Sequence, residues 1–187
     1  DALPILPTLD GEYCKIYTRD GKVYTGTILS CSPSVHVYPD ASTLERKDDT
    51  MEVRIDEVVH SKADVEKLGI NNGDFICIDT KTQITESGFI KSRFLDDKIS
   101  ATALMGVLKY LKDNNITPQR DLVIMFSTYE EVGHGASCLP EEVEELLAVD
   151  MGCIGTDLAC TEQDVSICAK DSSGPYDYEM ITRLVEL

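Results

Sequence analysis

Hydrophobic and polar residues alternate in short runs through the first half of the chain, the pattern of half-buried β-strands. Tyr13–Thr18 and Val23–Ile28 are rich in β-branched and aromatic residues, and Asp20 and Gly21 lie between them. Because Asp and Gly both tolerate positive φ, this arrangement predicts a β-hairpin. Met51–Ile55 alternates apolar and charged residues and predicts a further strand.

A helix signal and another strand follow. Ser61 and Asp64 have the spacing of a capping box, with Asp in place of the usual Glu, and they predict a short helix that ends at Gly69. A turn at Gly73 then leads into Asp74–Ile78, which reads as a strand. About five short strands with one helix predict a small β-barrel or sandwich that ends near residue 88.

The second half changes to a pattern typical of α/β proteins. Apolar residues recur at helical spacing in Ile99–Asp113, which predicts a long helix with a buried stripe. The continuous apolar run Leu122–Phe126 predicts a strand that is covered on both faces. Pro140–Leu147 predicts a second helix, Ala148–Asp150 a short strand, and Tyr178–Leu187 a last helical segment.

Carboxylates stand next to these predicted elements. Asp96 and Asp97 precede the long helix, Glu130 and Glu131 follow the apolar strand, and Asp150 ends the short strand. Each has an ordinary alternative, since acids cap helices and populate solvated loops. In open α/β sheets, however, ligands bind outside the carboxyl ends of the strands. The sequence therefore predicts that five acids converge at one edge of a sheet.

Convergence of five acids has a chemical consequence. Their mutual repulsion would raise their pKa values and destabilise the site unless a cation compensates. Oxygen ligands with little histidine suit one or two divalent ions, and an adjacent carboxylate that is not a ligand can act as general base. The arrangement predicts metal-assisted hydrolysis, and ligand type alone does not separate zinc, cobalt and manganese.

Composition narrows the other function classes. The 187 residues contain 34 Asp and Glu against 17 Lys and Arg, a net charge of −17 that disfavours nucleic acid and anionic membranes as partners. The seven cysteines form no C-x-x-C pair, which argues against a zinc ribbon or a complete disulfide framework. The chain shows neither a membrane-spanning apolar run nor a signal peptide. These features predict a soluble, cytoplasmic protein.

Together these motifs resemble a known family. Leu95–Lys98 before a helix, Glu130–Gly133 after a hydrophobic strand, and Ala148–Asp150 about 20 residues later are similar to the tetrahedral, or glutamyl, aminopeptidases. These are cytosolic dinuclear-metal peptidases that include FrvX-like and cellulase M-like proteins. The hairpin of residues 11–37 and the segment 68–74 resemble the inserted β-barrel domain of the family, so the resemblance covers essentially the whole chain.

The resemblance implies a role for each acid. Asp96 would bridge two metal ions, and Asp97 would follow it across a cis peptide and belong to the catalytic set. Glu130 would be the general base that acts on the shared water, Glu131 a ligand of one metal, and Asp150 a ligand of the other. From the residues alone, the roles of Glu130 and Glu131 could be exchanged.

The resemblance also implies an architecture and partners. Residues 89–187 would be the central, incomplete part of a mixed-sheet α/β metallopeptidase domain, and residues 1–88 an inserted, PDZ-like β-barrel used for dimerisation and oligomerisation. Two divalent metal ions, zinc or cobalt with manganese as an alternative, would serve peptide substrates. Family members form dimers that assemble into dodecamers.

Two histidine ligands of the family have no counterpart here. One is expected in a His-x-Asp motif upstream of the inserted domain and one near the C-terminus, whereas His36 and His60 lie within the predicted barrel. His134 follows the Glu-Glu motif and is a weak candidate for substrate binding. Since the chain starts at Asp1 without Met and stops inside a helical pattern, we expect a fragment that binds metal poorly and is inactive alone.

Two alternative functions share these features. A dinuclear metal amidohydrolase or deacylase would use the same carboxylates, and cleavage of acylated rather than unblocked peptides would identify it. A noncatalytic interaction module could be built on the barrel. Capture of a partner by residues 1–88, with no hydrolysis by the longer protein, would identify that function.

Overall fold

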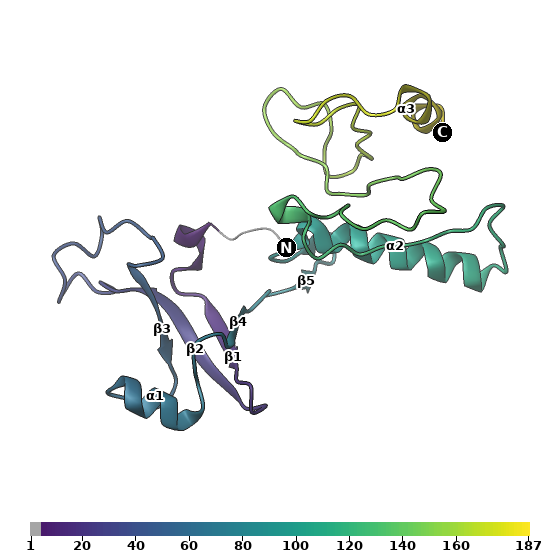
Figure 1. Cartoon of the computed structure of the whole chain (residues 1–187). Coiled ribbons are helices and arrows are strands. Elements are labelled where there is room, and N and C mark those ends of the chain that lie inside the picture. The colour runs from purple at the N-terminus through teal and green to yellow at the C-terminus, as the bar shows by residue number, and fades with distance from the viewer. Residues whose placement is uncertain (1–4) are drawn as a thin grey trace. The chain divides into compact units, whose positions relative to one another are not determined.

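The computed structural model describes residues 5–187 as a mixed α/β chain (Figure 1). The chain divides into two compact units, the first made of the residues up to Leu95 with 127–137, the second of 96–126 with 138–187. The elements in chain order are η1 (Leu6–Leu9), β1 (Tyr13–Tyr17), β2 (Val23–Ser30), β3 (Met51–Ile55), α1 (Lys62–Leu68), β4 (Phe75–Ile78), β5 (Gln83–Ile84), β6 (Ile90–Lys91), α2 (Leu95–Asp113), η2 (Glu130–Val132) and α3 (Tyr178–Val185).

The predicted hairpin is confirmed as β1 and β2. The strands pair antiparallel with Tyr17 opposite Val23, which leaves the five residues 18–22 between the two strands. Gly21 has φ +84° in that turn, a conformation that glycine adopts without steric cost. The backbone N–H of Thr18 donates to the carbonyl of Lys22 at 3.0 Å and closes the turn.

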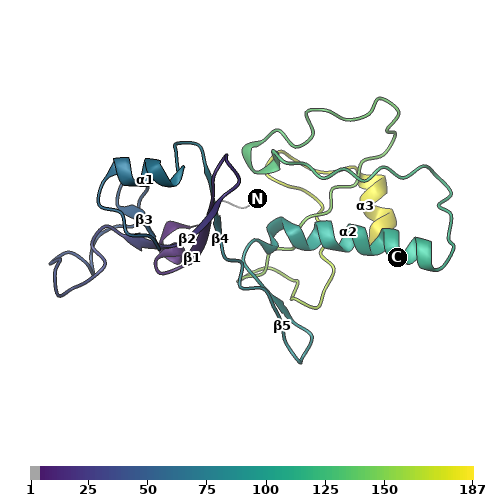
Figure 2. The same ribbon diagram turned by 90° about the horizontal axis from the view of Figure 1, so that it is seen from below.

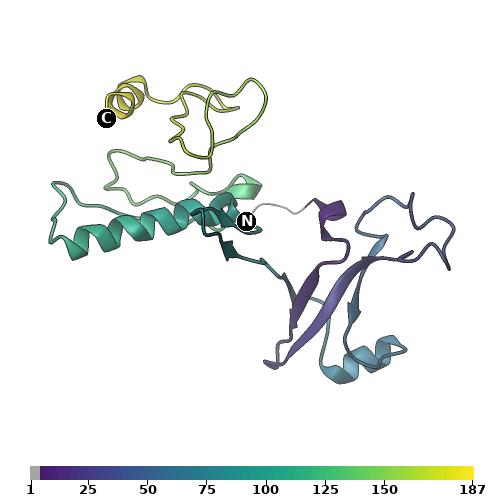
Figure 3. The ribbon, with the colours of Figure 1, turned by 180° about the vertical axis from the view of Figure 1, so that it is seen from behind.

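A four-stranded antiparallel sheet, in the order β3-β2-β1-β4, forms the body of the first unit (Figure 3). Side chains on its inner face form a small core: Cys14 and Ile16 of β1 are each 3% exposed, and Ile28 and Leu9 are also buried. The strands predicted at Met51–Ile55 and Asp74–Ile78 are confirmed as β3 and β4 of this sheet. Within residues 5–187 these two are the sheet edges, so closure into a barrel stays a prediction.

Helix α1 forms with the caps that the sequence predicts. The Ser61 side chain accepts from the backbone N–H of Asp64, while Asp64 reaches back to the N–H of His60 at 3.2 Å. Gly69 ends the helix with φ +92°, and its N–H donates to the carbonyl of Glu66.

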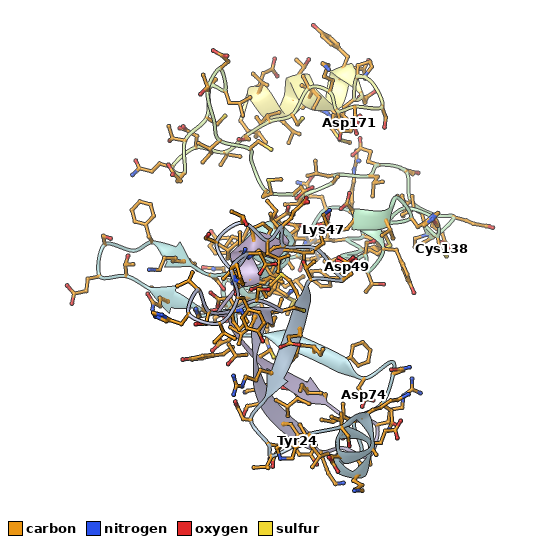
Figure 4. The ribbon with its side chains drawn as sticks, turned by 90° about the vertical axis from the view of Figure 1, so that its left-hand side faces the viewer. Tyr24, Lys47, Asp49, Asp74, Cys138 and Asp171 are labelled. Atoms are coloured by element: carbon orange, nitrogen blue, oxygen red, sulfur yellow. The ribbon has the colours of Figure 1, made fainter. Side chains whose placement is uncertain are left out.

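The end of α1 is tied to the β1–β2 hairpin. The hydroxyl of Tyr24 donates to the carbonyl of Leu68 at 2.7 Å, and Lys22 Nζ donates to the same oxygen at 3.3 Å. Arg19 at the hairpin turn lies 4.0 Å from the carboxylate of Asp74. Figure 4 labels Tyr24 and Asp74 at this end of the first unit. The α1–β4 connection is thus held by side chains of the hairpin.

The chain leaves the sheet through the small β5–β6 hairpin (Figure 2). Three charged groups meet beside it: Glu12, just before β1, lies 2.6 Å from Lys81 and 3.2 Å from Arg93. Lys81 and Arg93 together hold the pKa of the Glu12 carboxyl below its usual value. These contacts join residues that are about 70 to 80 positions apart in the sequence.

Helix α2 is confirmed and begins four residues before the predicted Ile99. Its apolar stripe, however, is not buried as predicted: Val107 is 45% and Leu108 is 40% exposed, and Ser100 is its one buried residue in the described chain. A stripe becomes buried only where another element packs on it. Among the described residues the stripe is covered only in part, since Ile99, Leu104 and Leu111 are half-buried.

Three further predictions for the second half are wrong for this structure. Leu122–Phe126 and Ala148–Asp150 are not strands, and Pro140–Leu147 is not a helix; the segment between α2 and α3 is largely coil (Figure 3). A strand needs a neighbour for its backbone hydrogen bonds, and the described residues provide none. A helix of about two turns is marginal in water without tertiary packing.

Ion pairs tie parts of this coil together instead. Glu145 accepts from Arg120 at 2.8 Å and from Arg183 of α3 at 2.9 Å, and Arg183 lowers the pKa of Glu145 with a smaller contribution from Arg120. Helix α3 confirms the predicted C-terminal helical pattern, and Asp177 caps it by accepting from the backbone N–H of Met180.

The cysteines and the hydropathy of the helices bear on the predicted cellular location. The seven cysteines are all free thiols. No helix within residues 5–187 is long and apolar enough to cross a membrane.

The close approach of β3 to β2 makes a testable prediction. A Cβ at Gly26 would lie 2.8 Å from the carbonyl oxygen of Arg54 and 3.0 Å from Val53. Because the obstacle is backbone, we expect Gly26→Ala to lower the free energy of unfolding of the first unit by about 1–3 kcal/mol. Urea denaturation followed by circular dichroism measures the change. Lys15→Ala on the exposed face of β1 should change it by less than about 0.5 kcal/mol; equal stability of both variants would contradict the prediction.

Candidate functional site

Asp96 and Asp97 lie in the first turn of α2, where the backbone departs from helical geometry. Asp96 has φ −86° and ψ 108°, and Asp97 has φ −115° and ψ 40°. The peptide bond between them is cis, as the family resemblance implies. Phe94, two residues earlier, has φ +59°. The regular helix therefore starts only after both aspartates, and their carboxylates belong to an irregular turn rather than to a simple helix cap.

One carboxylate oxygen of Asp97 lacks a hydrogen-bond donor. This oxygen, Oδ1, is buried and has no hydrogen-bond partner. A buried carboxylate oxygen without a donor is costly, so such an atom indicates an interaction with a donor or a cation. Among the five candidate acids, only this buried oxygen shows such a deficit in the described chain.

Glu130 and Glu131 begin the short helix η2, in a loop of the first unit. Gly133 ends it with φ +80°, and its N–H donates to the carbonyl of Glu130 at 2.9 Å. The N–H of His134 donates to the carbonyl of Tyr129 at 2.9 Å, so the turn is closed twice. Both glutamates and His134 are exposed. This geometry presents the two carboxylates to solvent from one tight turn.

Sequence reasoning missed a residue that packs against Glu130. A Cβ at Gly135 would lie 3.0 Å from the hydroxyl of Ser127 and 3.2 Å from both Cα and Cβ of Glu130. The absence of a side chain at Gly135 is therefore what allows the loop to fold back on the glutamate. The sequence signal for this approach is the Gly-x-Gly spacing of residues 133–135, in which Gly135 follows the Glu-Glu-x-Gly motif.

Asp150 lies in exposed coil of the second unit. Its Oδ1 accepts from the backbone N–H of Met151 at 2.6 Å. Nearby, the Asp171 carboxylate accepts from the hydroxyl of Tyr176 at 2.9 Å and raises the pKa of that phenol, to which the charge of Asp150 adds a smaller contribution. The charge of Asp150 thus acts on Tyr176, in the loop before α3.

The five acids divide between the two units. Asp96, Asp97 and Asp150 belong to the second unit, and Glu130 and Glu131 to the first. Within residues 5–187, no three His, Cys, Asp or Glu side chains lie together in a position to hold one metal ion. The donors have the right chemistry for a hard divalent cation, but these residues form no complete metal site. The predicted convergence of all five stays a prediction.

The histidines add no ligand group. His36 lies in the exposed β2–β3 loop, and His60 precedes the cap of α1. His134 is held through its backbone, since its carbonyl accepts from the hydroxyl of Ser137 at 2.8 Å.

Comparison with known proteins gives two kinds of match. Residues 6–187 match the family described as M42 glutamyl aminopeptidase. The chain is 49% identical over 181 residues to a Bacillus subtilis (strain 168) protein named "Putative aminopeptidase YhfE", covering 96% of this chain and 52% of that protein. The chain therefore spans about half the length of the curated relative that it matches.

A solved structure is also similar in part. It is an aminopeptidase, APDkam598, from the archaeon Desulfurococcus kamchatkensis, with 24% sequence identity and a TM-score of 0.46. The match covers 57% of this chain and 27% of that chain.

The packing of Gly135 against Glu130 predicts a local perturbation. We expect Gly135→Ala to displace the η2 loop, because its Cβ would be closer to Glu130 than ordinary contact allows. Amide chemical shifts of residues 127–135 should move while those of β1 and β2 stay unchanged. Ser137→Ala, which removes a hydrogen bond to His134 without crowding Glu130, is the matched control. Unmoved Glu130 resonances in Gly135→Ala would show that the contact is not restrictive.

Proposed function

The chain belongs to the M42 glutamyl aminopeptidase family, and on that premise we propose that it is the central part of a metal-dependent aminopeptidase. The complete enzyme would remove N-terminal residues from peptides. The observation that carries the proposal is the family match over residues 6–187, which includes all five candidate acids. Because the chain spans about half of its curated relative, the activity is assigned to the longer protein.

The proposed ligands are Asp96, Glu131 and Asp150. The buried, unpartnered Oδ1 of Asp97 supports a cation near the Asp96–Asp97 turn, since a positive charge would offset the cost of burying a carboxylate oxygen. All the donors are carboxylates, which suit divalent ions, and the family implies two of them, zinc or cobalt with manganese as the alternative. Such ions would polarise the scissile carbonyl and make a water molecule more acidic.

Glu130 is the proposed general base. It would accept the proton of the attacking water at its carboxylate and return it to the leaving amine. Two backbone hydrogen bonds close the turn that contains Glu130, from the N–H of Gly133 to the carbonyl of Glu130 and from the N–H of His134 to the carbonyl of Tyr129. They support this role because they fix the backbone at Glu130 while its side chain stays exposed. His134, in the same turn, is the proposed contact to the substrate.

The longer protein would complete this site. The family implies two further histidine ligands, one before and one after the present chain. The exposed apolar run that includes Val123 (62%) and Phe126 (50%) supports further packing, because so much apolar surface is unusual in a finished domain.

The first unit has a separate proposed task. Residues 1–88 would form the inserted, PDZ-like module, with residues 89–187 in the catalytic domain, and the module would mediate assembly into dimers and dodecamers. Tyr17 and Phe75, cross-strand neighbours on β1 and β4, are 41% and 75% exposed, and Tyr13 is 65% exposed. Exposed aromatic side chains on one sheet face support self-association. Seven free thiols support a reducing, cytoplasmic setting.

Glu130→Gln in the longer protein tests the catalytic assignment. The substitution keeps size and polarity but removes the basic oxygen, so we expect turnover to fall by about 10²–10⁴-fold while metal content is retained. Glu131→Gln is the matched control, and it should lower metal content as well. Unchanged turnover in Glu130→Gln would reject Glu130 as the base.

Substrate form tests the reaction class. An aminopeptidase should release amino acids from unblocked peptides and leave N-acylated peptides intact, because the free amino terminus is part of its recognition. Cleavage of acylated substrates only would identify a deacylase, and no hydrolysis of either would favour the interaction module.

The present chain tests the assignment of activity to the longer protein. By itself we expect it to bind divalent metal weakly and to hydrolyse no peptide. Turnover by the purified 187-residue chain would overturn that expectation.

A further inference from the structure

Three charged residues and one threonine of the first unit contact one another just before the segment that leads to Asp96. We call Glu12, Lys81, Arg93 and Thr8 the Glu12 clasp. Lys81 Nζ lies 2.6 Å from Glu12 Oε2, and Arg93 Nη2 lies 3.2 Å from Glu12 Oε1. The Glu12 side chain is only 15% exposed, so its charge is compensated mainly by these two cations rather than by water.

Arg93 makes more contacts than this ion pair requires. Its Nη2 also donates to the carbonyl of Thr8 at 2.6 Å, and its Nη1 donates to the Thr8 hydroxyl at 3.3 Å. Its backbone N–H donates to the carbonyl of Thr80 at 3.0 Å. The guanidinium side chain is 24% exposed. Both the main chain and the side chain of Arg93 are therefore anchored. The side-chain contacts to Glu12 and Thr8 use several N–H donors of the planar guanidinium, which lysine cannot reproduce.

The anchored residue stands immediately before the irregular turn. Only Phe94 and Leu95 separate Arg93 from Asp96. Three residue steps span at most about 11 Å, so a fixed Arg93 limits where the Asp96 backbone can lie. Phe94, with φ +59°, turns the chain between them.

We propose that Arg93, held by the Glu12 clasp, is a positioning residue for the Asp96–Asp97 turn. This inference rests on the proposed function, in which Asp96 is a metal ligand. The clasp contacts neither substrate nor metal in this proposal; it acts through the two residues that connect it to the ligand. Ligand placement within a fraction of an ångström governs metal affinity, and groups that orient ligands contribute accordingly.

Hydrogen exchange of the 187-residue chain tests the positioning directly. We expect Arg93→Met to accelerate exchange of the amides at the start of α2, residues 98–103, by about tenfold, the effect of losing a charge-assisted hydrogen bond. Amides 106–113, in the second half of the same helix, should be unchanged. Lys47→Met is the matched control, because Lys47 pairs only with exposed Glu45 in the same unit.

Lys81→Met provides a milder variant in case Arg93→Met does not fold. It removes one half of the compensation of Glu12 but leaves the contacts of Arg93 to Thr8, so the acceleration at residues 98–103 should be smaller and in the same direction. Unchanged exchange at 98–103 in a folded clasp variant, or equal acceleration along the whole of α2, would overturn the proposal.

Metal affinity in the longer protein separates positioning from a purely structural role. With Co²⁺ as the probe, we expect Arg93→Met to raise the apparent dissociation constant by about tenfold or more, with the lost activity restored by excess Co²⁺. An unaltered dissociation constant, or an activity loss that excess metal does not restore, would contradict positioning. If the wild-type longer protein cleaves no peptide, the proposed function fails while the exchange experiment still decides the role of the clasp.

Discussion

The backbone pairing of β1 is the interaction on which the first unit depends. β1 is hydrogen-bonded to β2 on one side and to β4 on the other, and its inward side chains, Cys14 and Ile16, are the most buried apolar residues of the sheet. The hairpin brings β2 to it through a local turn, whereas β4 arrives from about 60 residues further along the chain. The docking of the α1–β4 connection on the hairpin, through Tyr24 and Leu68, follows from this arrangement.

The same requirement explains the second unit. Leu122–Phe126 has the composition of a strand, but its backbone has no neighbouring strand within the described residues, and it remains coil. Helix α2 forms nevertheless, because a helix satisfies its hydrogen bonds within its own segment. Helical backbone geometry in α2 therefore does not require that its whole apolar stripe be buried.

Features of the fold and of the candidate site were predictable where they depend on residues close together in the sequence. Turn residues, the Ser61 and Gly69 caps and the irregular start of α2 at Asp96 and Asp97 all follow from short sequence signals, the last through a family resemblance. The Glu12 clasp was not predictable, because nothing in the sequence near residue 12 specifies a partner at residue 81 or 93. The close approach of Gly135 to Glu130 also depends on how the η2 loop folds back, and the Gly-x-Gly spacing of residues 133–135 does not specify which residue Gly135 approaches.

For this protein, amino-acid order alone was sufficient for elements whose hydrogen bonds close over a few residues: the β1–β2 hairpin, α1, α2 and α3. Its periodicity also identified which side chains are apolar, but not whether they are covered. Whether an apolar side chain is covered, whether residues 122–126 form a strand, and how the charge of Glu12 is compensated all depend on distant segments, because a strand or a buried charge is stable only when its partner is present. Glu12 has such partners in Lys81 and Arg93, whereas residues 122–126 have no neighbouring strand among the described residues and are coil. That is why local patterns succeeded at helices and turns and failed at the strands of the second half.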